Sequence, residues 1–228
     1  MVVLKFMDIL KESDDNIFIP RRTKEEKDKK LLFRDYRKIR DYIKNGSPGD
    51  LDFSGSPIEF LPKNLTQVNG DLRLIECENL KSLPSGLNIE GDLYLIRCKN
   101  LQSLPNGLKV KGHLYLTSSN INQLPQDLEF GRGIYLERTP IEKLPNNLTV
   151  NGDLDLEGCK NITSLPSGLK VSNTLNLFDN NINELPPDLE VYDRLILYGT
   201  PLSKLSRDKI KKMIPNVKGR ILGVSNIY

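Results

Sequence analysis

The side chains best suited to reactive chemistry are three cysteines, Cys77, Cys98 and Cys159, and a single histidine, His113. Cys77 and Cys98 stand 21 residues apart, so a disulfide or a shared metal is conceivable if the fold brings them together. A structural zinc site needs four ligands, however, and the remaining ones are not in view. One histidine also leaves little room for a two-histidine mechanism. We therefore expect buried, reduced cysteines with a structural role.

Carboxylates form a second candidate cluster, made of Glu137, Asp153, Asp155, Glu157 and Asp179. Clustered carboxylates can act as acid and base or bind Ca²⁺. The alternation of apolar and polar residues places these side chains on an open sheet, without a pocket or companion ligands. We expect solvated charge or recognition of a basic partner here, and we predict no catalytic residue, no metal and no cofactor.

Three tyrosines, Tyr94, Tyr115 and Tyr135, occupy the same place in successive strand-like segments. Each stands between two apolar residues of an alternating run, so its side chain should point out of the sheet. Tyrosine and arginine dominate binding hot spots, and exposed isoleucine beside them indicates a contact patch. The predicted partner-binding residues are Arg73, Ile75, Tyr94, Ile96, Arg97, His113, Tyr115, Tyr135 and Arg138. The alternative, which stays open, is that the tyrosines only stabilise the sheet.

A repeat supplies the elements that position these residues. The dipeptide Leu-Pro recurs at steps of 20 to 22 residues, at Pro62, Pro84, Pro105, Pro125, Pro145, Pro166 and Pro186. A fixed period in this range indicates a solenoid. Each repeat also holds an apolar-x-apolar triplet, the pattern of a half-buried strand, and one strand per repeat stacked in register builds a parallel sheet. Because proline fixes φ and lacks a donor, we expect an extended or polyproline-like return after each strand.

This pattern resembles the leucine-rich repeat in its short bacterial form, with Leu-Pro on the convex side. The resemblance covers residues 49–205 and recurs eight times. It implies an α/β solenoid that is mostly β: a right-handed horseshoe with a parallel sheet on the concave face and helical caps at both ends. It also implies binding, usually of another protein, without naming the partner.

Two further implications follow from the resemblance. Family members often carry Asn or Cys three residues past the second strand leucine, where the side chain satisfies buried turn backbone. In this chain that column reads Ser56, Cys77, Cys98, Ser119, Thr139, Cys159, Asn180 and Thr200. Some bacterial relatives also carry a cysteine-dependent ubiquitin-ligase domain. No cysteine follows Cys159, so we expect no such domain and no enzymatic activity in this chain.

Both ends of the chain depart from the repeat. We expect an N-terminal segment with a capping helix over 1–48, eight repeats over 49–205 and a C-terminal cap over 206–228. Thr23 followed by Glu26 is a capping box and predicts a helix over 23–44, ended by Asn45-Gly46. Ser206 predicts a second helix, and residues 221–222 a last strand. Within the first 22 residues, 6–10 could form a short helix and 17–20 an extended segment.

The formal net charge of +3 is distributed unevenly. Residues 1–46 carry +4, residues 47–203 carry −7 and residues 204–228 carry +6. Basic ends could contact nucleic acid or an acidic partner. They lack interleaved aromatic residues and any known nucleic-acid motif, so we favour solvated basic surfaces and expect no nucleic-acid binding.

Hydropathy and the start of the sequence suggest where the protein acts. No stretch approaches the roughly 18–20 apolar residues of a membrane span, and Lys5 and Asp8 interrupt any secretory signal. We expect a cytoplasmic protein, or one in the host cytoplasm or virion if the chain is viral. The predicted function is non-enzymatic binding of another protein through the concave sheet face. The alternative is a structural or accessory component of a larger assembly, such as a phage or viral particle, attached through the basic termini.

Overall fold

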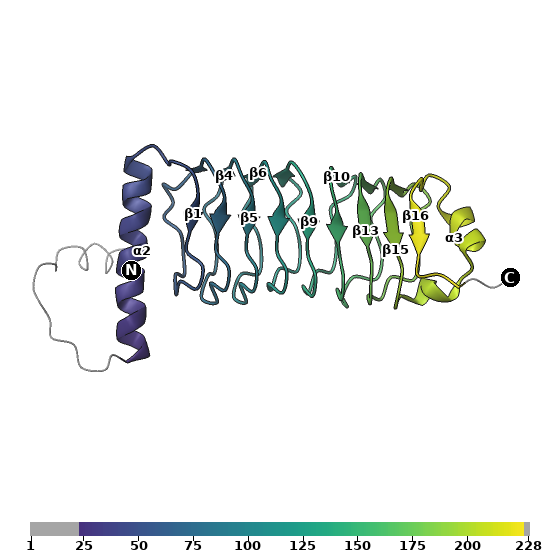
Figure 1. Ribbon diagram of the computed structural model, residues 1–228, viewed down its shortest axis with the longest axis horizontal. Helices are drawn as coiled ribbons and strands as arrows, with labels where there is room; N and C mark the ends of the chain where they lie inside the picture. The colour runs from purple at the N-terminus through teal and green to yellow at the C-terminus, as the bar shows by residue number, and fades with distance from the viewer. Residues whose placement is uncertain (1–22, 226–228) are drawn as a thin grey trace, which may run out of the picture.

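The computed structural model describes residues 23–225 and shows a mostly-β parallel solenoid of about seven turns with few helices. Its strands lie side by side along the long axis of the molecule (Figure 1). Paired residues on neighbouring strands are 21 positions apart at Leu51 and Leu72 and 20 apart at Leu114 and Ile134. The predicted parallel-strand repeat is confirmed. The elements predicted before residue 23 lie outside the described residues.

The largest sheet has nine parallel strands, formed by the apolar-x-apolar triplets together with one strand that follows the last of them. Backbone bonds link each repeat to the next, as where Leu93 N–H donates to His113 O at 2.9 Å and Leu95 N–H to Tyr115 O at 2.8 Å. The strands in spatial order are β1 (Leu51–Asp52), β3 (Leu72–Arg73), β5 (Leu93–Tyr94), β7 (Leu114–Tyr115), β9 (Ile134–Tyr135), β11 (Leu154–Asp155), β13 (Thr174–Asn176), β15 (Arg194–Ile196) and β16 (Arg220–Leu222).

Each return segment holds a second short strand, which the sequence analysis did not predict. These strands pair in parallel into a sheet of four and a sheet of three. Only one residue of each two-residue strand faces the core, so the strands lack an alternating signature. The four-stranded sheet contains β2 (Gln67–Val68), β4 (Asn88–Ile89), β6 (Lys109–Val110) and β8 (Glu129–Phe130), and the three-stranded sheet contains β10 (Thr149–Val150), β12 (Lys170–Val171) and β14 (Glu190–Val191).

The Leu-Pro-x-x-Leu segments are turns, so the prediction of an extended, polyproline-like return was incomplete. Leu65 N–H donates to Pro62 O at 3.0 Å, closing a four-residue turn. Gly86, the third residue of the equivalent turn one repeat later, has a φ of +69°, as the third position of a type II turn requires. A solenoid repeat of about 21 residues must change direction sharply, and the Leu-Pro-x-x-Leu turn provides one of these changes.

Leucine layers fill the interior. In a single repeat Leu93, Leu95, Leu101 and Leu108 are all fully buried, and Leu104 of the Leu-Pro dipeptide is 5% exposed. Stacked repeats join these layers into one continuous core. The regularity fixes every other residue of the large sheet on the outer face, where the candidate site lies.

Helices stand at both ends of the strand array. Helix α2 (Lys24–Lys44) starts at Thr23 with the predicted capping box and contributes Ile39 and Tyr42 to the core. It lies across the end of the solenoid beside β1 (Figure 1), and Lys38 Nζ donates to the Asp52 carbonyl oxygen at 2.8 Å. After β15 come the 3₁₀ helix η1 (Pro201–Lys204) and α3 (Arg207–Met213), which Ser206 caps as predicted. Strand β16 contains the predicted residues 221–222.

Candidate functional site

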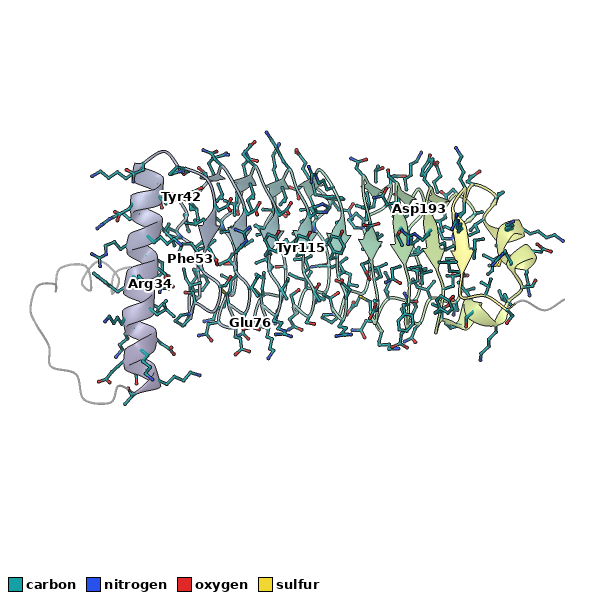
Figure 2. All side chains as sticks on the ribbon, viewed as in Figure 1. Arg34, Tyr42, Phe53, Glu76, Tyr115 and Asp193 are labelled. Atoms are coloured by element: carbon teal, nitrogen blue, oxygen red, sulfur yellow. The ribbon has the colours of Figure 1, made fainter. Side chains whose placement is uncertain are left out.

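The three tyrosines form a continuous stack across the outer face of the nine-stranded sheet. The ring centroids of Tyr94 and Tyr115 are 4.6 Å apart with an interplanar angle of 8°, and those of Tyr115 and Tyr135 are 4.8 Å apart at 9°. This spacing matches that of neighbouring strands, because each ring comes from the same position of its repeat. We call these three residues the tyrosine stripe. Tyr115 lies near the middle of the row of strands (Figure 2).

The predicted neighbours of the tyrosine stripe divide into two groups. The first group lies beside the stripe and consists of Arg73, His113, Ile75 and Ile96. The Arg73 guanidinium carbon lies 5.3 Å from the Tyr94 ring centroid. The His113 ring is tilted against both Tyr115 and Tyr135, at 5.8 Å from each centroid. Ile75 and Ile96 are half-buried in the adjacent outward column. The structure therefore brings together seven of the nine predicted residues.

Arg97 and Arg138 lie instead on the turns that follow the strands. Both have left-handed backbone, with φ of +59° and +57°. Arg97 bonds Glu76 at 2.6 Å, and Arg138 lies 3.6 Å from Glu157. Neither guanidinium lies over an aromatic ring in residues 23–225. Strand alternation does not extend into these turns, so it could not predict the direction of the two side chains.

A ladder of aspartates supports the tyrosine stripe, and the sequence analysis missed it. The aspartate just before a strand accepts the backbone N–H of its counterpart in the next repeat: Asp50 from Asp71 at 2.9 Å, Asp71 from Asp92 at 2.8 Å and Asp92 from His113 at 2.7 Å. The recurring Gly-Asp dipeptide before the strands was the available signal. Glycine is needed there because a Cβ at Gly91 would lie 2.7 Å from the backbone of the preceding repeat.

The aspartate ladder also binds two of the three tyrosine hydroxyls. Tyr94 donates to Asp92 Oδ2 at 3.1 Å, and Tyr135 donates to Asp153 Oδ2 at 3.3 Å. Burial, assisted by these carboxylates, raises the pKa of Tyr94 and of Tyr135 to about 12. Histidine replaces aspartate before Tyr115, and no group in residues 23–225 accepts a hydrogen bond from the Tyr115 hydroxyl. The central tyrosine thus differs from its two neighbours, whose hydroxyls are bound by the aspartate ladder.

The predicted acidic cluster lies beyond Tyr135, and its members differ in their ion-pair and hydrogen-bond partners. Asp179 is bound by Lys160 at 2.6 Å. Glu137 accepts from the Thr117 hydroxyl at 2.6 Å, and Asp155 accepts from the Glu157 N–H at 2.9 Å and from the Asn176 amide at 3.0 Å. Burial, reinforced by Glu137 and Glu157, raises the pKa of Asp155 although these hydrogen bonds oppose the shift.

All three cysteines are buried and free, and each serves the solenoid as a hydrogen-bond donor. The Sγ atoms of Cys77, Cys98 and Cys159 donate to the carbonyl oxygens of Phe53, Leu74 and Leu136 at 3.1, 3.0 and 3.1 Å. Each bond reaches back to the preceding repeat. Burial raises the pKa of Cys77 and of Cys98 to about 12, so these thiols stay protonated. The structural role predicted for the cysteine column is consistent with these contacts.

An open groove of about 480 Å³ lies beside the sheet, over the turns that carry Ser119 and Thr139. These two turns are one residue shorter than the turns of Cys98 and Cys159 on either side. The longer turns form the walls and supply Lys99 and Lys160. Both lysines are bound to carboxylates, Lys99 to Glu78 at 3.0 Å and Lys160 to Asp179. The third cation of the lining, Arg138, is more weakly paired, at 3.6 Å from Glu157.

A scan against protein-family models found no match to the chain, and a search of curated proteins found none either. Within residues 23–225, no group of three His, Cys, Asp or Glu side chains is arranged to hold a metal ion. The helices of the same region are too short or too polar to cross a membrane.

Proposed function

We propose that the chain is a non-enzymatic protein-binding module that holds its partner on the tyrosine stripe. The stack of three half-exposed tyrosine rings on an open sheet supports this function best. Tyrosine offers a large, rigid contact area at a low entropy cost, with a polar tip for hydrogen bonding. Arg73, His113 and Ile96 extend this area with the residue types of binding hot spots.

The fold in this proposal is a leucine-rich repeat of the short bacterial type. The nine-stranded sheet would be the concave face of a right-handed horseshoe. Helices α2 and α3 would be the caps, since they cover the first and last leucine layers with Ile39 and Ile210, both fully buried. The Leu-Pro period and the strand at each apolar-x-apolar triplet support this assignment.

Sheet stabilisation is the competing explanation of the tyrosine stripe, and the hydroxyls distinguish the two. Stacking alone needs only rings, and phenylalanine would provide it. Tyr115 instead carries a hydroxyl without a partner in residues 23–225, at the centre of the stack. Water accepts from this hydroxyl in the free protein, and a docked partner would replace that water with an acceptor of its own. Both uses of the rings can coexist, because stacking occupies their faces and leaves their outer edges to solvent.

The test is site-specific photocrosslinking in the cells from which the protein comes. A benzophenone amino acid at Ile96 lies on the stripe face, whereas one at Lys109 lies on the separate four-stranded sheet. We expect discrete protein adducts from position 96 only, and we expect Tyr115→Ala to remove them while the circular dichroism spectrum is retained. Equal adducts from both positions, or adducts that survive Tyr115→Ala, would contradict the proposal.

A second candidate function is attachment to a larger assembly through the C-terminal segment. Its basic side chains are all exposed, and none forms an ion pair within residues 23–225; they are Lys204, Arg207, Lys209, Lys211, Lys212, Lys218 and Arg220. Replacing Lys209, Lys211 and Lys212 by glutamate should release the protein from the assembly while crosslinking at position 96 is unchanged. Retention of that variant would exclude this function.

A further inference from the structure

One end of the tyrosine stripe already carries an arginine. The Arg73 guanidinium lies over the Tyr94 ring, with its carbon 5.3 Å from the centroid. The same group donates to Asp50 at 3.0 Å and to Asp71 at 2.5 Å. The planar guanidinium combines ring stacking with two hydrogen bonds to carboxylates of the aspartate ladder, which a lysine ammonium cannot do as well. The carboxylates raise the pKa of Arg73 further, so its charge is permanent.

At the other end of the tyrosine stripe, carboxylates again lie near a tyrosine ring, but no arginine or lysine of the described residues covers the ring. Tyr135 stacks on Tyr115 with one ring face, and the next residue in the column is the short Asp155. In residues 23–225, no guanidinium or ammonium group lies over the Tyr135 ring. The ladder carboxylate of that repeat is Asp153, which is the counterpart of Asp71 beside Arg73.

The charge at this end is largely uncompensated. Glu137 follows β9, whereas Asp153, Asp155 and Glu157 lie at or next to the neighbouring β11. Arg138 is their only ion-pair partner within residues 23–225. That contact is long, with 3.6 Å between Arg138 Nη2 and Glu157 Oε1, and the Arg138 side chain is 71% exposed. Glu137 and Glu157 repel the charge of Asp155, so a bound cation would relieve the repulsion.

We propose that this end of the tyrosine stripe binds an arginine side chain of the partner protein. Its guanidinium lies on the outer face of Tyr135 and donates to Asp153 and Asp155, as Arg73 does at Tyr94 with Asp50 and Asp71. The partner segment is therefore basic and matches the acidic middle of the chain in charge, since residues 47–203 carry −7. This inference rests on the proposed function of the face and adds the chemistry of the partner.

The experiment is a nuclear magnetic resonance titration of the ¹⁵N-labelled full chain with N-acetyl-arginine methylamide. The control ligand is N-acetyl-citrulline methylamide, which keeps the shape of the side chain and lacks the charge. We expect saturable amide shifts at residues 135 and 153–157 with the arginine compound alone. Tyr135→Ala and Asp155→Asn should each weaken binding by about two- to fivefold, the range of one exposed cation–π contact or ion pair. Asp179→Asn is the matched control, because Lys160 already binds that carboxylate.

Three results would overturn the inference: equal shifts with citrulline, shifts that map elsewhere, or variants that bind arginine like the wild type. Salt-sensitive self-association that Asp155→Asn abolishes would also overturn it, because the occupant would then be a second copy of this chain. Crosslinking at position 96 tests the face without arginine. A face that crosslinks a partner but ignores the arginine compound therefore fails this inference and leaves the proposed function standing.

Discussion

Removal of the central ring of the tyrosine stripe should destabilise the solenoid by a predictable amount. Tyr115→Ala deletes two stacked contacts, at 4.6 Å to Tyr94 and 4.8 Å to Tyr135. An aromatic pair contributes about 0.5–1.5 kcal/mol beyond its buried area, so the free energy of unfolding should fall by about 1–3 kcal/mol. Tyr115→Phe keeps both contacts and removes a hydroxyl without a partner in residues 23–225, so its stability should equal that of the wild type.

Urea denaturation followed by far-ultraviolet circular dichroism measures this loss, with Tyr198→Ala as the control. The Tyr198 side chain is 51% exposed and stacks on no ring within residues 23–225, so its removal should cost about 0.5 kcal/mol or less. Because neighbouring repeats unfold together, the denaturant slope should stay unchanged. Equal losses for Tyr115→Ala and Tyr198→Ala would refute the stacking argument. A loss for Tyr115→Phe as large as for alanine would show that the hydroxyl has an internal partner.

Three further predictions follow from the groups whose pKa is raised. In a spectrophotometric titration, a tyrosine component should ionise near pH 12, and Tyr94→Phe with Tyr135→Phe should remove it; an unchanged curve would contradict the assigned burial. Because their thiol pKa is raised to about 12, Cys77 and Cys98 should react with a disulfide reagent only after denaturation. Fast labelling of the native protein would contradict the buried, structural role of these cysteines. Asp155→Asn should raise the melting temperature at pH 7, because the raised pKa of Asp155 means that its ionised form destabilises the folded state. The gain should shrink as the pH falls toward the ordinary carboxyl pKa, where Asp155 is protonated in both states. A gain that is the same at every pH would show that ionisation of Asp155 is not its cause.

The sequence predicted the parts of the fold that alternation and period encode. Leu-x-Leu triplets one repeat apart gave the parallel sheet, and the capping box at Thr23 gave helix α2. The second strands, such as β4 (Asn88–Ile89), were missed because two residues with one apolar member carry no period. The aspartate ladder was missed because its hydrogen bonds join positions one repeat apart, such as Asp71 and Asp92, and alternation within a strand does not reveal such bonds.

The candidate site was predicted in its residues more than in its geometry. The column that holds Tyr94, Tyr115 and Tyr135 follows from strand alternation, and the structure stacks the rings as neighbours on the sheet. The directions of Arg97 and Arg138 could not be predicted, because both residues take a left-handed conformation that turns the chain out of the strand. Such a conformation is uncommon outside glycine and has no reliable pattern in a single sequence.

The central claim, that a partner docks on the tyrosine stripe, is tested most directly by quantitative affinity capture with matched baits. Tyr115→Ala and Tyr198→Ala remove the same type of side chain, one from the tyrosine stripe on β7 and one from the turn that follows β15. We predict that a protein retained by the wild type and by Tyr198→Ala is lost from Tyr115→Ala, with all three baits folded at the temperature of capture. Retention of the same protein by all three baits would contradict the claim.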